Sequence, residues 1–476
     1  MHLRPLKTNI FPPAPGLKKL IGPSFILLGL GLGSGEIILW PYLTSNYGMG
    51  IIWGALLGLT FQFIMNMEIE RYALTRGESV FVGLTRKLRW IPVWFLLSTF
   101  IPWVWPGIIA SSAKLFGHVI GFENNNLLPI GMLIAIGLIL SLGPVLYKTV
   151  ETLQKILIGI GVPTIFLLSI FLAKPTGWVD LAKGTIGIGN NFMFLPEGIA
   201  IASFLAALAY AGAGGNLNLA QAFYVREKGY GMGKYAGRIT SLITGKKEEV
   251  SLTGSKFELS VSSLNNFQTW WRNVNIEHFI IFWLTGSITM VLLGLLSYST
   301  VFGMEGNTQG LSFVIREAEV IGQRLFPFMG TFFLLVASLT LFGTQLTVFD
   351  ATSRILTENA VLTAYPKLSE KHIPWIYYLV LWLQIIGGII IFSRGFTEPL
   401  QLLTIAAVLN AFAMFVHVGL TLWLNISSLE KPLRPSKARI SLMSLAFLFY
   451  GGFSVYTIID KLIGWVNIQK FIQNLF

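Results

Sequence analysis

The sequence predicts an all-α polytopic membrane protein with eleven transmembrane helices, arranged as a five-plus-five inverted repeat followed by one extra helix. Of its 476 residues, 54% are hydrophobic and only 12% are charged, whereas a soluble protein carries about 25% charged residues. Apolar segments of about 20 residues, the length that crosses a bilayer, recur along the chain. Glycine-rich stretches interrupt the first and the sixth of these segments, which cross the membrane in opposite directions. Equivalent features of opposite direction, five spans apart, are typical of an inverted repeat.

Basic residues between the predicted spans indicate the orientation of the chain. Loops on the side of the N-terminus hold 26 of the 34 lysines and arginines. Because basic residues collect in cytoplasmic loops, we expect an integral plasma (inner) membrane protein with its N-terminus in the cytoplasm and its C-terminus outside. The predicted spans are 22–44, 50–69, 91–116, 127–147, 152–173, 198–224, 276–300, 326–349, 374–393, 399–425 and 440–461.

The chain divides into four predicted regions. Residues 1–20 form a proline-rich, basic cytoplasmic arm, and residues 21–173 form the first repeat, with helices 1–5. Residues 174–425 form the second repeat, with helices 6–10, and residues 426–476 hold helix 11 and the C-terminus. The longest polar stretch, residues 225–275, is interpreted as a solvated cytoplasmic connector, with a regulatory or gating loop as the alternative.

The interruption of the first span combines four glycines with a carboxylate. Glycine costs about 1 kcal/mol relative to alanine inside a helix, so residues 29–36 are expected to break it. A carboxylate inside a span costs about 2.5–3.5 kcal/mol, which makes Glu36 a candidate for holding a cation or carrying a proton. Gly33, Ser34 and Gly35 are candidates for substrate contact beside it. In the alternative interpretation, Ser34 caps the outer half-helix and Glu36 interacts with its dipole.

The interruption of the sixth span contains no charge and offers backbone groups and amides. Ala213, Gly214, Gly215 and Asn216 are candidates for substrate binding, and Asn218 lies on the half-helix that follows. Unpaired backbone at membrane depth is tolerated only where it is buried in protein or lines a wet cavity. We therefore expect the two interruptions to face one polar pocket. A helix kink capped by Asn216, with Asn218 in an interhelical hydrogen bond, is the alternative.

Other polar residues within the spans are candidates for proton transfer or gating. Gln62 in the second span and Gln345 in the eighth are interpreted mainly as amides that hold helices together. His417 is the histidine deepest in a span and is a candidate proton relay, with a hydrogen-bonded packing role as the alternative. Asp350 and Arg354 stand at the i, i+4 spacing of a helical ion pair, near enough to the inner surface to be solvated.

The residues around the two interruptions resemble those of the Nramp (natural resistance-associated macrophage protein) family. The resemblance rests on Gly22-Pro23-Ser24-Phe25 before the first interruption, the Tyr47-Gly48 turn, Gln62, and Asn216-Leu217 after the second interruption, and it covers roughly residues 20–425. It implies a LeuT-type fold with discontinuous helices 1 and 6. It also implies the activity of that family, which is proton-coupled transport of divalent metal ions.

The metal-binding motifs of that family are altered in this chain. Family members carry Asp-Pro-Gly-Asn in the first interruption, where this chain has Gly33, Ser34, Gly35 and Glu36. Their sixth helix carries Met-Pro-His, and the methionine position is Ala213 here. Since a thioether favours softer metals, its loss argues against a dehydrated transition metal. Glu36 is then the one predicted metal ligand; hydrated Mg²⁺, which needs only one or two carboxylates, is compatible with it, and so is a substrate that is not a metal.

The leading functional hypothesis is a secondary-active, alternating-access transporter of the Nramp-related type with a remodelled site. Its substrate is a divalent cation, Mg²⁺ among the candidates, with transport either coupled to protons as a symport or uncoupled; a small organic solute or anion is the alternative. A non-transporting membrane sensor is the third hypothesis. We find no Ser/His/Asp set, HExxH motif or phosphate-binding loop, and no cysteine, so we expect neither an enzyme nor a cofactor. The expected partners are the transported solute or cation, protons and the lipid bilayer, and not nucleic acid.

Overall fold

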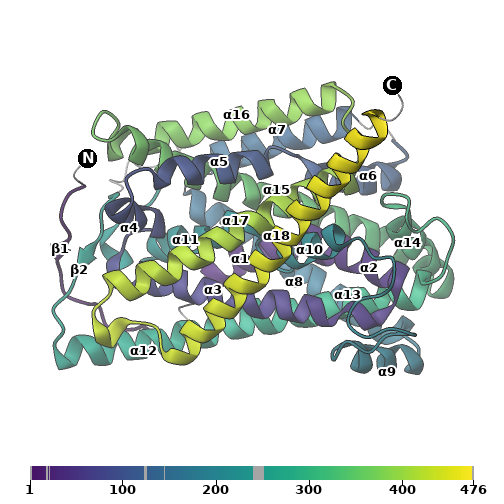
Figure 1. Cartoon of the computed structure of the whole chain (residues 1–476), viewed down its shortest axis with the longest axis horizontal. Helices are drawn as coiled ribbons and strands as arrows, with labels where there is room; N and C mark the ends of the chain where they lie inside the picture. The colour runs from purple at the N-terminus through teal and green to yellow at the C-terminus, as the bar shows by residue number, and fades with distance from the viewer. Residues whose placement is uncertain are drawn as a thin grey trace.

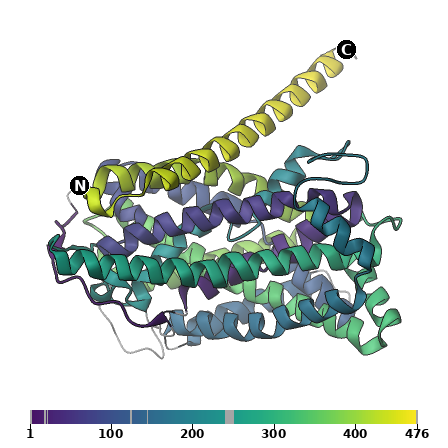
Figure 2. The same ribbon diagram turned by 90° about the horizontal axis from the view of Figure 1, so that it is seen from below.

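The computed structural model is a bundle of long helices aligned along one axis, with the last helix, α18, crossing it diagonally (Figure 1). It describes residues 3–17, 20, 22–122, 126–143, 145–239 and 251–473, and in 460–473 the backbone only. Parts of the predicted arm (18, 19 and 21) and of the predicted connector (240–250) lie outside the described residues. We call the end of the bundle that carries the N-terminal arm the arm end. From there α18 runs to the opposite end (Figure 2), as an odd number of spans requires.

The described helices match the predicted spans. Within the described residues, nine helices are long and apolar enough to cross a membrane; α7, which is shorter, and the interrupted sixth helix complete the predicted eleven. The first five spans correspond to α1 (Pro23–Gly31) with η2 (Gly35–Leu39) and α2 (Trp40–Tyr47), α3 (Trp53–Arg76), α5 (Ile91–Trp103) with α6 (Gly107–Ile120), α7 (Leu127–Leu142) and α8 (Leu146–Leu172). The other six are α10 (Ile201–Ala209) with η4 (Gly215–Ala220) and α11 (Gln221–Lys228), η6 (Phe279–Leu284) with α13 (Thr285–Val301), α15 (Pro327–Ala364), α16 (Ile373–Ser393), α17 (Pro399–Ser428) and α18 (Lys437–Gln473).

Short elements connect these spans. The connecting helices are η3 (Met49–Ile51), α4 (Val80–Lys87), α9 (Pro175–Gly184), η5 (Gly231–Tyr235), α12 (Val261–His278), α14 (Ser312–Arg324), η7 (Glu370–His372) and η8 (Lys431–Leu433). Strands β1 (Lys7–Thr8) and β2 (Ser255–Lys256) pair in parallel and form a two-stranded sheet.

The predicted connector is partly wrong, because its last third is helical. Residues 261–275 belong to α12, which continues through η6 into α13 as one helical segment, Val261–Val301. The Ser260 hydroxyl accepts a hydrogen bond from the Ser263 amide at 3.2 Å and so caps the start of this helix. Phe267 and Trp270 are buried on the side of the helix that meets the N-terminal arm. Although α12 is polar in overall composition, Phe267 and Trp270 form an apolar stripe on one of its faces.

Helix 1 is interrupted over a shorter stretch than its glycines predict. The α-helix ends at Gly31, and the chain resumes as a π-helix from Gly35 after the turn at Leu32 and Gly33. The Ile37 amide already donates to the Gly33 carbonyl at 2.9 Å. Among the described residues Ser34 makes no side-chain capping bond, so the interpretation of Ser34 as a helix cap is wrong.

Helix 6 is interrupted more completely. α10 ends at Ala209, and residues 210–214 form an irregular turn before the 3₁₀ helix η4 begins at Gly215. Gly214 and Gly215 have φ angles of 72° and 54°, in the left-handed region that favours glycine. Both predicted interruptions are therefore confirmed, and they leave backbone groups that need partners from other helices.

Candidate functional site

The two interruptions pack directly against each other inside the bundle. A Cβ atom added to Gly31 would lie 3.0 Å from the Cα of Gly212, and one added to Gly35 would overlap the carbonyl oxygen of Tyr210. Helix 1 can approach helix 6 this closely only because both positions lack a side chain. The contact places Gly31 and Gly35 of the first interruption against Gly212 and Tyr210 of the second.

Gln62 of α3 bridges the interruption of helix 6. Its amide nitrogen donates to the Ala209 carbonyl at 3.0 Å, and its amide oxygen accepts from the Gly214 amide at 3.2 Å. One buried side chain thus satisfies the last carbonyl of α10 and the amide at the end of the turn. This agrees with the interpretation of Gln62 as an amide that holds helices together, and the gating role of Gln62 stays a prediction.

Asn216 points from η4 toward α5. Its amide nitrogen donates to the hydroxyls of Ser98 and Thr99 at 2.8 and 2.9 Å. The side chain therefore joins two helices and does not cap η4, so the capping alternative is wrong. Its Oδ1 is buried and has no hydrogen-bond partner among the described residues, and the same holds for both amide atoms of Asn218.

Helix α17 contributes two side chains to the same region. The Asn410 amide nitrogen donates to the Tyr210 hydroxyl at 3.0 Å, and its side chain packs against Gly215. His417 Nε2 lies 3.0 Å from the Gly215 carbonyl oxygen, so the histidine packs against the interruption as its alternative interpretation has it. The Tyr210 ring stacks on Trp103 of α5 with centroids 5.6 Å apart.

Glu36 faces a different helix. Its Oε2 accepts a hydrogen bond from the Thr289 hydroxyl of α13 at 2.7 Å, while its Oε1 is buried and without a partner in the part of the chain that the structure describes. Within the described ranges, no group of three or more His, Cys, Asp or Glu residues could hold a metal ion. Among the described residues, Glu36 therefore bonds to α13, whereas Asn216 bonds to α5.

The eighth span supports the first interruption. The Thr344 hydroxyl donates to the Gly29 carbonyl at 2.9 Å, and its side chain packs against Gly33. Gln345, the next residue, is buried in α15. Because Gly33 has no side chain, helix 1 can pack closely against α15 here.

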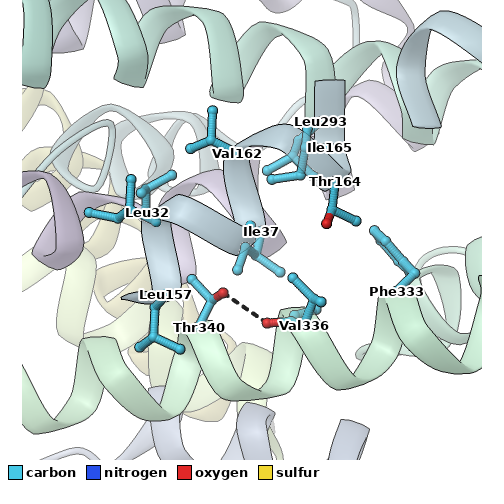
Figure 3. A pocket seen from close by; sticks show the side chains of 13 residues that line it. Leu32, Ile37, Leu157, Val162, Thr164, Ile165, Leu293, Phe333, Val336 and Thr340 are labelled. Carbon is cyan, nitrogen blue, oxygen red and sulfur yellow. Dashed lines mark hydrogen bonds between the residues drawn. The ribbon is translucent and has the colours of Figure 1, made fainter. Parts of the chain in front are cut away.

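A small apolar cavity lies beside the first interruption, between α8, α13 and α15 (Figure 3). Leu32 and Ile37 line it from helix 1. The two threonines in its wall, Thr164 and Thr340, donate their hydroxyl hydrogen bonds to carbonyls of their own helices at 2.8 Å. Because these hydroxyls are already paired and the rest of the lining is apolar, the cavity does not suit a polar solute.

A buried ion network at the arm end was largely missed by sequence reasoning. Arg354 bonds Asp350 at 2.8 Å, which confirms the predicted pair, and it also pairs with Glu227 of α11. The pair is buried, so its predicted solvation is wrong, because α11 and the Tyr377 ring of α16 cover it. Arg226, which precedes Glu227 in the chain, bonds Glu358 of α15 at 3.1 Å. The charged run 226–228 at the end of helix 6 was the signal for this network.

Glu317 is a second buried carboxylate, on α14 outside the membrane-spanning helices. It is 2% exposed, and burial raises its pKa to about 8, against a weaker opposing effect of the Ser297 hydroxyl. The folded protein therefore binds a proton here that the unfolded chain, with a pKa near 4.5, has released at neutral pH.

We expect the free energy of unfolding to fall as pH rises from about 4.5 to about 8, by between about 2 and 5 kcal/mol for this one group. The variant Glu317→Gln should remove this part of the pH dependence and be more stable than the natural protein at pH 9. Denaturant unfolding in detergent at several pH values measures both quantities. If the free energies of unfolding of the natural protein and the variant change with pH in parallel, the raised pKa of Glu317 is contradicted.

Among known proteins, this chain is similar to solved structures and to no family model or curated sequence. The sequence matches no model of a protein family, and no curated protein matches it. Among solved structures, a manganese transporter of Eremococcus coleocola is similar, with 13% identity, 97% of this chain and 91% of that chain covered, and a TM-score of 0.67.

Two further solved structures are transporters. Mhp1, of the nucleobase-cation-symport-1 family, has 14% identity, 100% and 96% coverage and a TM-score of 0.54. MhsT, solved with L-phenylalanine, has 16% identity, 90% and 98% coverage and a TM-score of 0.50. At these identities the likeness establishes the fold: this chain is an integral multi-pass membrane protein with the LeuT-type fold. The fold of the predicted resemblance is thus confirmed, and the Nramp family itself stays a prediction.

Proposed function

We propose that this chain is a secondary-active transporter that works by alternating access and carries a small polar organic solute between the interruptions of helices 1 and 6. One observation carries the proposal: two unwound segments touch inside the bundle, and buried amides beside them lack partners among the described residues. Interrupted helices that meet in this way are the best structural pointer to a transport site.

The unpaired amides favour an organic ligand. A buried polar group without a partner costs about 1–3 kcal/mol, which a ligand that bonds to it would recover. Asn216 Oδ1, Asn410 Oδ1 and the Asn218 amide are such groups among the described residues. The stacked Trp103 and Tyr210 rings add a flat apolar surface next to them. Neutral amides and aromatic rings suit a polar organic molecule better than a metal ion.

Alternating access requires the two ends of the bundle to open in turn. At the arm end, α11 is held to α15 by the ion pairs of Arg354 with Glu227 and of Arg226 with Glu358. These contacts join the end of the interrupted helix 6 to a long continuous helix. Their release would let α11 move away, so we assign the described conformation to one closed at the arm end.

A divalent cation is the second candidate substrate. Two observations favour it: Glu36 Oε1 has no partner among the described residues, and the chain is similar in fold to a manganese transporter. With one carboxylate, the ion would be a hydrated one such as Mg²⁺, which keeps several waters. Glu36 is also the group that would couple transport to protons, because it lies buried between helix 1 and α13.

Calorimetric titration of the purified protein separates these candidates. The ligands are amino acids, nucleobases, organic acids, Mn²⁺ and Mg²⁺, and the variants are Asn216→Leu and Glu36→Gln, with Asn265→Leu on the exposed face of α12 as control. We expect an organic ligand whose affinity falls at least about tenfold in Asn216→Leu, because a buried hydrogen-bond partner is lost.

The same affinity should stay within twofold of the natural protein in the Asn265→Leu control. Loss of cation binding in Glu36→Gln, with Asn216→Leu unaffected, would instead support the cation. If no ligand binds and no solute flux occurs in proteoliposomes, the transporter proposal is wrong and a non-transporting sensor becomes the better hypothesis.

A further inference from the structure

The N-terminal arm runs across the arm end of the bundle in extended form and pairs with the segment before α12 (Figure 1). Lys7 and Thr8 of β1 lie opposite Ser255 and Lys256 of β2. Asn9 extends the pairing, since its backbone amide donates to the Lys256 carbonyl at 2.9 Å and its side-chain amide donates to the Ser255 hydroxyl at 2.8 Å. The arm is therefore bound to a segment almost 250 residues away.

The next part of the arm is bound to α12 itself. Phe11 is 1% exposed and packs on Phe257 and on Phe267 of α12, with ring centroids 4.4 and 6.2 Å away. Beyond it the arm is rich in proline, which has no amide hydrogen to pair with. The Trp270 indole of α12 instead donates to the Pro12 carbonyl at 3.0 Å. These contacts use side chains of the polar stretch that the sequence marked as a connector.

α12 also holds the first turn of α1, into which the arm leads. The Ser24 hydroxyl bonds the Glu277 carboxylate and lies 2.7 Å from His278 Nδ1. The Gly22 amide donates to Glu277 at 3.5 Å. Outside α12, the hydroxyl of Tyr230, which precedes η5, donates to the Leu20 carbonyl. The arm and the start of helix 1 are thus fastened to the same helix at successive points.

α12, η6 and α13 form one helical segment, and Thr289 of α13 bonds Glu36 at the candidate site. This segment therefore contacts the arm at Phe11 and Pro12, and helix 1 both at its start and at its interruption. We propose that residues 7–15 of the arm, together with residues 255–257 and α12, form a latch that keeps the arm end closed. This inference rests on the proposed alternating-access function.

An engineered disulfide tests the latch, since the chain contains no cysteine that could interfere. Thr8 and Lys256 are exposed partners in the parallel pair. Adjacent strands lie about 4.8 Å apart, which is within the range of about 4.4–6.8 Å that a disulfide bridges. The readout is hydrogen–deuterium exchange of residues 23–31 in the full-length T8C/K256C protein, oxidised and reduced, with T8C and K256C alone as controls.

If the latch must open before helix 1 moves, oxidation should slow exchange in residues 23–31 at least about tenfold, and reductant should restore it. Deletion of residues 2–12 should speed that exchange by a similar factor. Equal exchange in the oxidised and reduced proteins, or unchanged exchange after the deletion, would overturn the latch. A protein that still transports solute in the cross-linked state would overturn the latch as well while leaving the transporter proposal intact, whereas a protein without flux in any form would overturn the proposed function.

Discussion

Replacing Arg354 by methionine is expected to destabilise the protein by about 3–5 kcal/mol, because it leaves two carboxylates in the interior without their cation. Arg354 is 1% exposed and bonds Asp350 at 2.8 Å and Glu227. The rings of Tyr224 and Tyr377 lie within 6.0 Å of its guanidinium carbon. The loss should appear as a lower free energy of unfolding in denaturant titrations.

A compensated variant distinguishes unpaired charge from lost packing. The triple variant R354M/D350N/E227Q removes the stranded charges and should recover most of the lost stability, since neutral groups cost less to bury. Arg394→Met, at an exposed position after α16, is the matched control and should change stability by less than about 0.5 kcal/mol. An effect of Arg354→Met as small as that of the control would show that the network does not hold α11 to α15.

Replacing Gly35 by alanine should destabilise the protein by about 3 kcal/mol and abolish ligand binding. A Cβ atom at this position overlaps the Tyr210 carbonyl oxygen, which is backbone and cannot rotate away. Helix 1 and helix 6 would have to separate to make room. Thermal unfolding and calorimetric titration of the same preparation measure the two effects.

Gly387→Ala in α16 is the matched control for this substitution. No atom lies within 4 Å of its added Cβ among the described residues, and alanine is favoured over glycine in a helix by up to about 1 kcal/mol. The control should therefore be neutral or slightly stabilising. If Gly35→Ala is equally well tolerated and still binds ligand, the contact between the two interruptions is not essential to the site.

The interruptions and the membrane-spanning pattern could be predicted from the sequence because their causes are local. Gly214 and Gly215 take backbone conformations that other residues rarely adopt. Asp350 and Arg354 are neighbours on one helix face whatever the tertiary structure. Such features depend on spacing along the chain alone.

The partners of the site residues could not be predicted, because they come from distant helices. Ser98 and Thr99, which bind Asn216, resemble any hydroxyl residues in an apolar helix. Glu36 faces Thr289 and not Asn216, since the π-helix that begins at Gly35 sets the direction of its side chain. The role of α12 was hidden because its apolar stripe is matched by a proline-rich arm far away in the sequence.

The most direct test of the central claim is the accessibility of Ala213, which is buried in the interruption of helix 6. In proteoliposomes, the single thiol of an A213C variant can be challenged with a membrane-impermeant maleimide from either side. Alternating access predicts modification from both sides and protection by a transported solute. A thiol that reacts from neither side, or from one side alone whatever the solute, would contradict the account.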